Sequence, residues 1–440
     1  SICGTGIMAQ IEIKIRVASA DYFVSDTEYM SSDGTYYHGF VDSAPNLALG
    51  SSRGGFLTVR SGMIVLTSEP DNTYHPFGLT RFATLLTQSA YEVEIKFDTL
   101  HPLFAGTIVL DQISNDQLRF VFYATEYDVQ AISTVSDVNS NTQYNPFSHG
   151  TIANRQPIVQ TGAQTFRNPA LATSGITVHE EGTDRFSSAT STTITTSGYT
   201  GKNVCVSGTG LSGTTLEQFF DYVADTLDLD VTTADTTKTS SAASRVIHLY
   251  VTQPQLLIDL ASAVAESTNH EFHISPNPTS GDTTLYLIDR ANNPTATVIE
   301  DIDVISTSYK LPFPIASVIG NYQVTERKSD QLYTQGVSVV ASNVPIGSTI
   351  NKNMLADKIS QVAEVQTIIT AIKNIEIKPT ATITVADIQT DWKAGDRFTL
   401  NRQTDLITID MIVRSISYNF VSQDTTISGD ATLSEFITNR

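Results

Sequence analysis

The stretch from Lys378 to Ile437 alternates apolar and polar residues over almost its whole length. An alternation with a period of two is the signature of strands that bury one face. Ala381, Ile383 and Val385 fall on one side of the first segment, and the threonines between them fall on the other. The stretch therefore predicts four or five antiparallel strands joined by short polar turns, which form a small barrel or sandwich.

Finer features of this stretch lead to more specific expectations. We expect a turn at Ala394–Asp396, followed by a strand that carries Phe398 and Leu400. The apolar positions of Ile407–Val413 form the face of one strand, and those of Ile416–Phe420 are expected on another strand.

A second region of the same kind lies near the start of the chain. Its clearest strands are Gln10–Val17, with Ile at positions 11, 13 and 15, and Tyr91–Phe97. Shorter strands are expected at 35–41, 55–59, 63–66, 107–110 and 118–123. Residues 1–135 are therefore predicted to form another small antiparallel barrel or sandwich domain.

The middle of the chain has a different pattern. Residues 136–210 are rich in Ser, Thr and Gly and are expected to form edge strands and loops with little core of their own. Residues 211–311 predict an inserted domain of two helices and a hairpin. Its first helix starts at Thr214, which fits a capping box with Glu217, and its second follows Pro254. The expected hairpin strands are Glu271–Ser275 and Thr284–Ile288.

The last domain is predicted at residues 312–440. Strands near 298–304 and 316–324 precede a long helix at about Asn353–Ile372, which leads into the C-terminal barrel. The fold class is therefore mainly β within the α+β class, with two small antiparallel barrel or sandwich domains and an inserted helix-hairpin module.

Charge and composition exclude several classes of function. The 440-residue chain has a formal net charge of −20, so its surface repels nucleic acid and anionic membranes. No apolar run approaches the ~18 residues of a membrane span. The start of the sequence lacks the pattern of a signal peptide, although Ser1 need not be the encoded first residue. Cys3 and Cys205 are too few for a disulfide framework.

One glycine motif invites a cofactor interpretation. Gly208, Gly210 and Gly213 form a G-x-G-x-x-G segment after an apolar run and before a helix, with Asp230 near the acidic position of a dinucleotide site. The preceding strand is very short, and no further strand–helix–strand units follow. We therefore favour a flexible glycine linker between domains.

Other candidate residues are weighed in the same way. His270 and His273 would face opposite sides of a strand, which argues against a metal site. The acidic pairs Asp228/Asp230, Asp301/Asp303 and Glu180/Glu181 could serve a glycosidase only if they flanked a cleft. Cys205 lies among valines and is expected to be packed. We therefore assign no catalytic, cofactor-binding or metal-binding residue.

The C-terminal stretch resembles the hub proteins of phage baseplates and tail tips. The matching segments are Trp392–Leu400, Val413–Tyr418 and Thr425–Ala431, in this order and spacing. The segment Leu103–Ile108 also resembles the family's first domain, where Gly106 would provide a bulge or tight bend. The second predicted helix and its hairpin resemble the family too, with Asn269 in place of a Gly at a left-handed helix end.

This resemblance implies a structural protein of the virion, located at the distal end of a phage tail. It implies a homotrimer whose two barrels per chain match a sixfold tail tube. Its partners would be the tube protein, a distal tail or baseplate ring protein and a central spike or fibre, with DNA passing only through the lumen. It implies no enzyme activity and no cofactor. Two alternatives stay open, namely a tail-associated cell-wall hydrolase and a receptor-binding adhesin.

Overall fold

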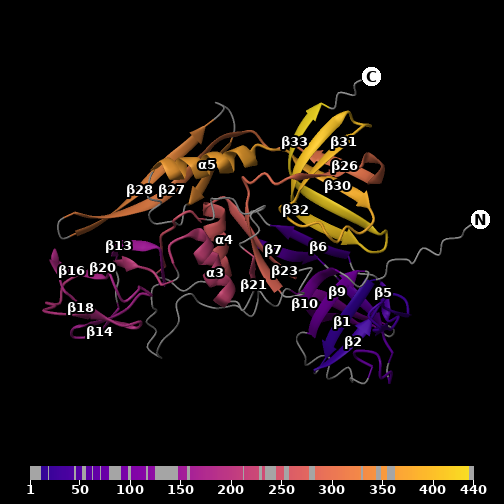
Figure 1. Ribbon diagram of the computed structural model, residues 1–440, viewed down its shortest axis with the longest axis horizontal. Coiled ribbons are helices and arrows are strands. Elements are labelled where there is room, and N and C mark those ends of the chain that lie inside the picture. The colour runs from indigo at the N-terminus through magenta and orange to yellow at the C-terminus, as the bar shows by residue number, and fades with distance from the viewer. Residues whose placement is uncertain are drawn as a thin grey trace, which may run out of the picture.

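The computed structural model describes most of the chain, and these residues are mainly in strands (Figure 1). The described ranges are 11–17, 19–43, 46–51, 56–61, 63–69, 71–78, 91–97, 101–114, 117–123, 147–155, 159–211, 213–226, 230–232, 244–251, 257–276, 283–328, 331–342, 348–353 and 362–435. Within these ranges, the α-helices are α3 (Leu216–Thr226), α4 (Leu257–Ser267) and α5 (Val362–Glu376). The predicted fold class, mainly β, is confirmed.

The N-terminal region forms a sheet of seven strands in the order β2-β1-β9-β10-β11-β8-β5. The alternating residues of β1 explain its position, because Ile11, Ile13 and Ile15 are buried while Arg16 is exposed. The strands are β1 (Ile11–Val17), β2 (Ala20–Val24), β5 (Val41–Ser43), β8 (Met63–Thr67), β9 (Tyr91–Phe97), β10 (His101–Ile113) and β11 (Gln117–Tyr123). All pairings in this sheet are antiparallel, as expected.

The bulge expected at Gly106 is not there. Gly106 pairs regularly with Val93, and the register of β10 shifts at two other places, between Pro102 and Phe104 and between Leu110 and Gln112. Each shift lets one strand add a residue and turn its side chains to the other face.

The C-terminal strands curl into a barrel-like unit, drawn in yellow and orange in Figure 1. On β30, Ala381, Ile383 and Val385 are buried, while Thr382 and Thr384 bond to hydroxyls of β33 at 3.1 and 2.9 Å. The strands are β25 (Ala296–Ile299), β26 (Val304–Lys310), β30 (Thr380–Ala386), β31 (Arg397–Arg402), β32 (Ile407–Asn419) and β33 (Asp424–Glu435). The short helix η2 (Asp301–Asp303) connects β25 to β26.

The prediction of two strands between Ile407 and Phe420 is wrong, because β32 is one continuous strand. Its register with β33 shifts between Val413 and Ser415, which makes Arg414 an extra, bulged residue. The bulge moves the buried positions from odd to even numbers, so Ile416 and Tyr418 face the same core as Val413.

The strand predicted at 55–59 belongs to a different sheet from the one expected. It is part of a hairpin formed by β6 (Asn46–Ser51) and β7 (Phe56–Ser61). β6 pairs with β32 of the C-terminal unit, and β7 pairs in parallel with β23 (His270–Pro276) of the inserted module. The hairpin thereby joins both into a sheet of eleven strands.

The inserted module forms as predicted, with one shift at its start. The capping box uses Thr215 and Gln218, whose side chains bond reciprocally to each other's backbone N–H at 3.2 and 3.1 Å, rather than Thr214 and Glu217. Helix α4 ends at Asn269, which has the expected left-handed conformation with φ of 61°. The hairpin of β23 and β24 (Thr283–Asp289) is antiparallel, and β21 (Asp230–Thr232) pairs in parallel with β24.

Residues 147–211 have a core of their own, contrary to expectation. Apolar side chains from several short strands are buried together; they are Ile152, Phe166, Leu171, Ile176, Val178, Ile194, Val204 and Val206. The strands are β12 (Phe147–His149), β13 (Thr151–Arg155), β14 (Gln160–Gly162), β15 (Thr165–Arg167), β16 (Thr177–Glu180), β17 (Thr183–Asp184), β18 (Phe186–Ala189), β19 (Thr193–Thr196) and β20 (Val204–Thr209), with β22 (Leu249–Val251) beside β12. Ser- and Thr-rich strands can therefore enclose a small core when their apolar positions alternate.

The predicted long helix, α5, is shorter than expected and begins further along the chain. Residues Ser348–Asn353 form β29, which pairs with β27 (Ile315–Lys328) beside β28 (Gln331–Ser342), and α5 begins at Val362. Val365, Ile368, Ile369 and Ile372 of α5 pack on this sheet. The apolar spacing identified the helix, but residues 354–361 of its predicted first half lie outside the described ranges.

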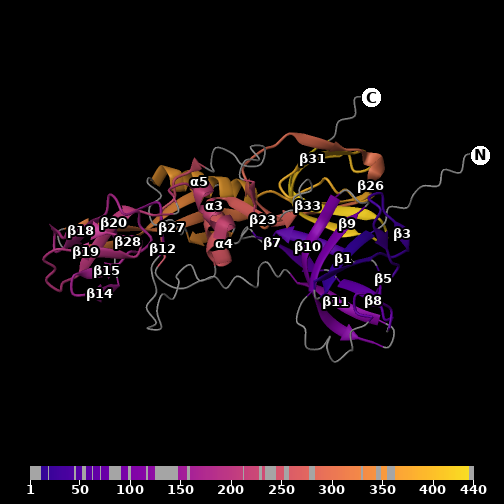
Figure 2. The same cartoon turned by 60° about the horizontal axis from the view of Figure 1, so that its bottom comes forward.

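The N-terminal sheet and the C-terminal strands share one continuous hydrophobic core. The rings of Phe97 on β9 and Phe420 after β32 lie 5.9 Å apart in this core. Both views show these two units together at one end of an elongated molecule, with the small sheets of residues 147–211 at the other (Figures 1 and 2). The division into four domains at the predicted boundaries stays a prediction.

Candidate functional site

Four charged side chains meet where the inserted module joins the C-terminal strands. Arg414 on β32 contacts Asp430 on β33 at 2.8 Å and Glu271 on β23 at 3.1 Å. Arg290, just after β24, lies 3.2 Å from Glu271 and 3.8 Å from Asp430. We call these four residues the charge quartet. It links two strands of the module to two strands of the C-terminal unit.

The bulge in β32 explains why Arg414 can take part. Val413 of β32 pairs with Gly429 of β33, and Ser415 pairs with Ser428. Arg414 is therefore the one extra residue of β32 between these two pairs. A Cβ on Gly429 would lie only 1.9 Å from the carbonyl oxygen of Ile412, so the close approach of the two strands requires glycine. The bulge and Gly429 together place an arginine in a strand that otherwise alternates buried and exposed residues.

The charge quartet is balanced and largely shielded from water. Its most exposed side chain, that of Asp430, is 19% exposed. Burial alone would lower the pKa of Arg414, but the neighbouring Glu271 and Asp430 outweigh burial and hold this pKa above its ordinary value. Buried ion pairs add little net stability, whereas loss of one partner is costly. We therefore expect the quartet to fix how the module sits on the C-terminal unit.

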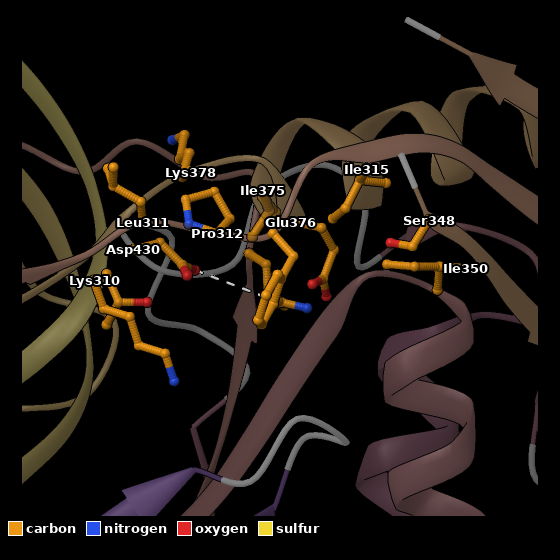
Figure 3. Close-up of a pocket in the computed structure, with 13 residues that line it drawn as sticks. Lys310, Leu311, Pro312, Ile315, Ser348, Ile350, Ile375, Glu376, Lys378 and Asp430 are labelled. Carbon is orange, nitrogen blue, oxygen red and sulfur yellow. Dashed lines mark ion pairs between the residues drawn. The ribbon is translucent and has the colours of Figure 1, made fainter. Parts of the chain in front are cut away.

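A hollow of about 560 Å³ lies beside the quartet, and Arg290 and Asp430 form part of its wall (Figure 3). Segments from five parts of the chain converge on it, including the connection between β26 and β27 and the end of α5. Its lining residues are Arg290, Lys310, Leu311, Pro312, Phe313, Ile315, Ser348, Ile350, Ile375, Glu376, Lys378, Thr380 and Asp430.

The lining of the hollow combines charged and apolar side chains. The described residues of this lining include no histidine or cysteine. The hydroxyl of Ser348 donates a hydrogen bond to the Pro314 carbonyl, and Asp430 is engaged by both arginines. The ordinary nucleophile–base arrangement of a hydrolase therefore has no counterpart among these lining residues.

The module makes a second contact with the C-terminal unit at the predicted turn. Gly395 has φ of 86°, and a Cβ there would lie 2.9 Å from the Ile288 side chain on β24. Next to it, the Lys393 ammonium lies 5.5 Å from the centre of the Tyr286 ring. Residues 393–395 thus pack against β24 of the module's hairpin. Their contacts on this strand, Tyr286 and Ile288, lie just before Arg290 of the quartet in the sequence.

The glycine motif does not have the geometry of a dinucleotide site. Gly208 lies in β20, which pairs antiparallel with β13 and with β16, and Asp230 lies on β21 in another sheet. The interpretation as a flexible linker is wrong as well. The N–H of Gly210 donates to the Gly150 carbonyl at 2.8 Å, and Gly213 has φ of 99° in a turn before α3.

The histidine candidates are part of a structural strand. His270 is buried, and its Nδ1 lies 2.9 Å from the Thr268 carbonyl oxygen. Burial lowers its pKa to about 4, so the ring is neutral near pH 7. In the part of the chain that the structure describes, no group of three or more His, Cys, Asp or Glu residues could hold a metal ion. The side chain of His273 lies outside the described residues.

The acidic pairs are engaged by their own neighbours. Burial opposes ionisation of Glu180, but hydrogen bonds from Lys202 and Thr200 and the nearby Arg185 outweigh it and lower the pKa. Glu181 is exposed and pairs with Lys202. The structure does not bring these carboxylates to the hollow.

The pair Asp301/Asp303 lies on η2. Arg402 donates to Asp301 at 2.7 Å and, as the main cause, lowers its pKa, while Asp303 is exposed. Asp228 and the side chain of Asp230 lie outside the described residues. Cys205 is buried in β20, as predicted, and Cys3 is not described.

Sequence reasoning missed the charge quartet. Its members come from β23, β32, β33 and the end of β24, so no local spacing connects them. One signal was present, because the apolar alternation changes phase around Arg414. A phase change within a run of strand residues indicates a bulge, and a bulged charged residue next to a buried face is a candidate for ion pairing. In the described residues, no helix is long and apolar enough to cross a membrane.

Comparison with known proteins gives likenesses of fold only. No protein family and no curated protein sequence matches the chain. A 43 kDa tail protein of prophage MuSo2 from Shewanella oneidensis superposes with a TM-score of 0.48 and 10% identity, over 96% of this chain and 98% of that one. A tail protein from Neisseria meningitidis MC58 gives 0.48 and 10%, over 96% of each chain. Prophage tail protein gp18 from Listeria monocytogenes EGD-e gives 0.40 and 10%, over 95% and 94%. Similarity at this level does not establish a shared function.

Proposed function

We propose that the chain is a structural hub protein at the distal end of a phage tail, where three copies form a ring. The observation that carries the proposal is the shared core of its two curled β units. A shared core holds the two units at one fixed angle within each chain. Three chains would then present six β units, the number that a sixfold tube requires.

Unpaired strand edges support assembly into a closed ring. Within the described strands, β25 and β26 of the C-terminal unit each pair on one side only, with β31 and with β30 respectively. Open edges favour uncontrolled pairing unless something covers them. Heterologous contacts that close on themselves cover such edges without forming open filaments.

The charge quartet would give such a ring its second rigid connection. It ties the inserted module to the C-terminal unit through four side chains on separate strands. Such a connection would keep the module at a fixed position within each chain of the ring. The acidic chain would let DNA pass through the lumen without binding it.

The mass of the assembly tests this proposal. Light scattering on purified protein should give three times the 47.8 kDa of one chain. The same preparation should neither clear cell-wall substrate nor shift DNA at physiological salt. A monomer at high concentration would contradict the ring, and clearing that is lost on substitution of Glu180 or Asp301 would support the hydrolase alternative instead.

A further inference from the structure

A ledge of aromatic rings reaches the surface at the end of the N-terminal sheet. The ring of His38 lies 4.9 Å from that of Tyr74 in a stacked arrangement and 4.8 Å from that of Tyr36 edge-on. Tyr74 is 64% exposed and Tyr36 is 42% exposed, which is unusual for such large rings. We call Tyr36, His38 and Tyr74 the aromatic ledge.

Packing against buried rings holds the aromatic ledge in place. Tyr36 lies on β4 (Tyr36–Tyr37), which pairs with β3 (Tyr29–Met30) at the outer rim of the molecule in Figure 2. His38 stacks at 5.5 Å on the buried Phe40, and Phe40 contacts the buried His75 at 4.9 Å. The rings therefore have little freedom to lose when a ligand binds, which favours binding.

The two segments that build the aromatic ledge carry only negative charges, and one of these, Asp21, is paired with Lys14 and Arg16 of β1. The two segments, residues 18–52 and 61–80, contain no lysine or arginine. They contain seven carboxylates: Asp21, Asp26, Glu28, Asp33, Asp42, Glu69 and Asp71. One of these, Glu28, accepts a hydrogen bond from the Tyr36 hydroxyl at 3.2 Å, so a carboxylate lies directly at the ledge.

We propose that the aromatic ledge binds an arginine side chain presented by a protein partner. The faces of aromatic rings carry partial negative charge and attract cations. A guanidinium can stack flat on a tyrosine ring while its N–H groups point to a carboxylate such as Glu28, which a lysine ammonium cannot do as well. Nucleic acid, which also stacks on aromatic rings, is disfavoured by the seven carboxylates.

This inference goes beyond the proposed ring and does not depend on it. The aromatic ledge lies within the first eighty residues of a single chain, so it can be occupied whether or not the chain assembles. The hub proposal would only suggest which particle protein supplies the arginine.

The test compares three probes on the intact protein. A fluorescein-labelled peptide of alternating Arg and Gly, its Lys counterpart and a labelled chitin tetrasaccharide are titrated and followed by anisotropy. We expect saturable binding of the Arg peptide, weaker binding of the Lys peptide and no binding of the sugar. Leucine substitutions Y36L and Y74L keep the net charge and should weaken the Arg peptide about two- to fivefold each, the range of an exposed cation–π contact.

A matched control separates the rings from general charge attraction. Phe313 is an aromatic residue on the connection between β26 and β27 that is even more exposed, at 84%, and F313L should bind the Arg peptide like the unsubstituted chain. Circular dichroism should show all three variants folded, because each replaced side chain lies at the surface and outside the hydrophobic cores. Equal binding by Y36L, Y74L and F313L, equal affinity for the Arg and Lys peptides, or tighter binding of the sugar would overturn the proposal.

Discussion

Replacing Arg414 with methionine removes one cation from the charge quartet while keeping most of the side-chain volume. Arg414 contacts Asp430 at 2.8 Å and Glu271 at 3.1 Å. At an effective dielectric constant of about 20, each contact is worth about 5–6 kcal/mol of gross attraction. Removal of the buried guanidinium recovers several kcal/mol of desolvation cost.

Arg290 still faces both carboxylates after the substitution, but only at 3.2 and 3.8 Å. One guanidinium then has to balance two largely buried carboxylates. We therefore expect R414M to lower the free energy of unfolding by about 3–5 kcal/mol, as for other buried ion pairs that lose one partner.

Urea unfolding measures this effect through the only tryptophan. Trp392 packs 4.4 Å from the Phe398 ring in the same C-terminal unit, so its fluorescence reports on that unit. The matched control is R119M, which removes an exposed pair between Arg119 and Asp111 at 3.0 Å and should cost less than about 1 kcal/mol. If R414M costs no more than R119M, the quartet does not hold the module in place.

Three further substitutions test other parts of the structure. G429A should lower stability by about 1–3 kcal/mol in thermal unfolding, because its Cβ would overlap the Ile412 carbonyl, and an unchanged Tm would refute the bulge geometry. L260D places a charge in the buried core of the module and should cost several kcal/mol, whereas an unchanged Tm would mean that this face of α4 is exposed. Because the pKa of His270 falls from 6.5 to about 4 on folding, its contribution to stability should be full above pH 6.5 and lost as the pH falls toward 4. H270Q should flatten the stability profile in that range, and an identical profile would contradict the burial of the ring.

The sequence predicted the positions of strands and helices better than it predicted which strands pair with each other. Alternation located β1, β9, β30 and β33 because each of these strands buries one face, and helical spacing located α4. Alternation cannot say which strands pair, so the strand predicted at 55–59, which is β7, was assigned to the wrong sheet. The prediction also divided β32 into two strands at Val413. In the sequence, a single bulged residue interrupts the alternation in the same way as the end of one strand and the start of another.

The site was harder to predict than the fold, for a physical reason. Glu271 and Arg414 are 143 positions apart and meet only because β7 and β6 connect the module to β32. Sequence motifs describe local geometry, and the local motifs here, such as Gly208–Gly213, serve turns and strand packing. Asn269 is the exception, because the requirement for a left-handed residue at the end of α4 is itself local.

End-on imaging of the assembled particle or the purified ring tests the central proposal most directly. The shared core of the N-terminal and C-terminal units predicts three chains arranged around a lumen, with six similar β units in the inner ring. A ring in which only one unit of each chain faces the lumen, or particles without threefold symmetry, would contradict the proposal.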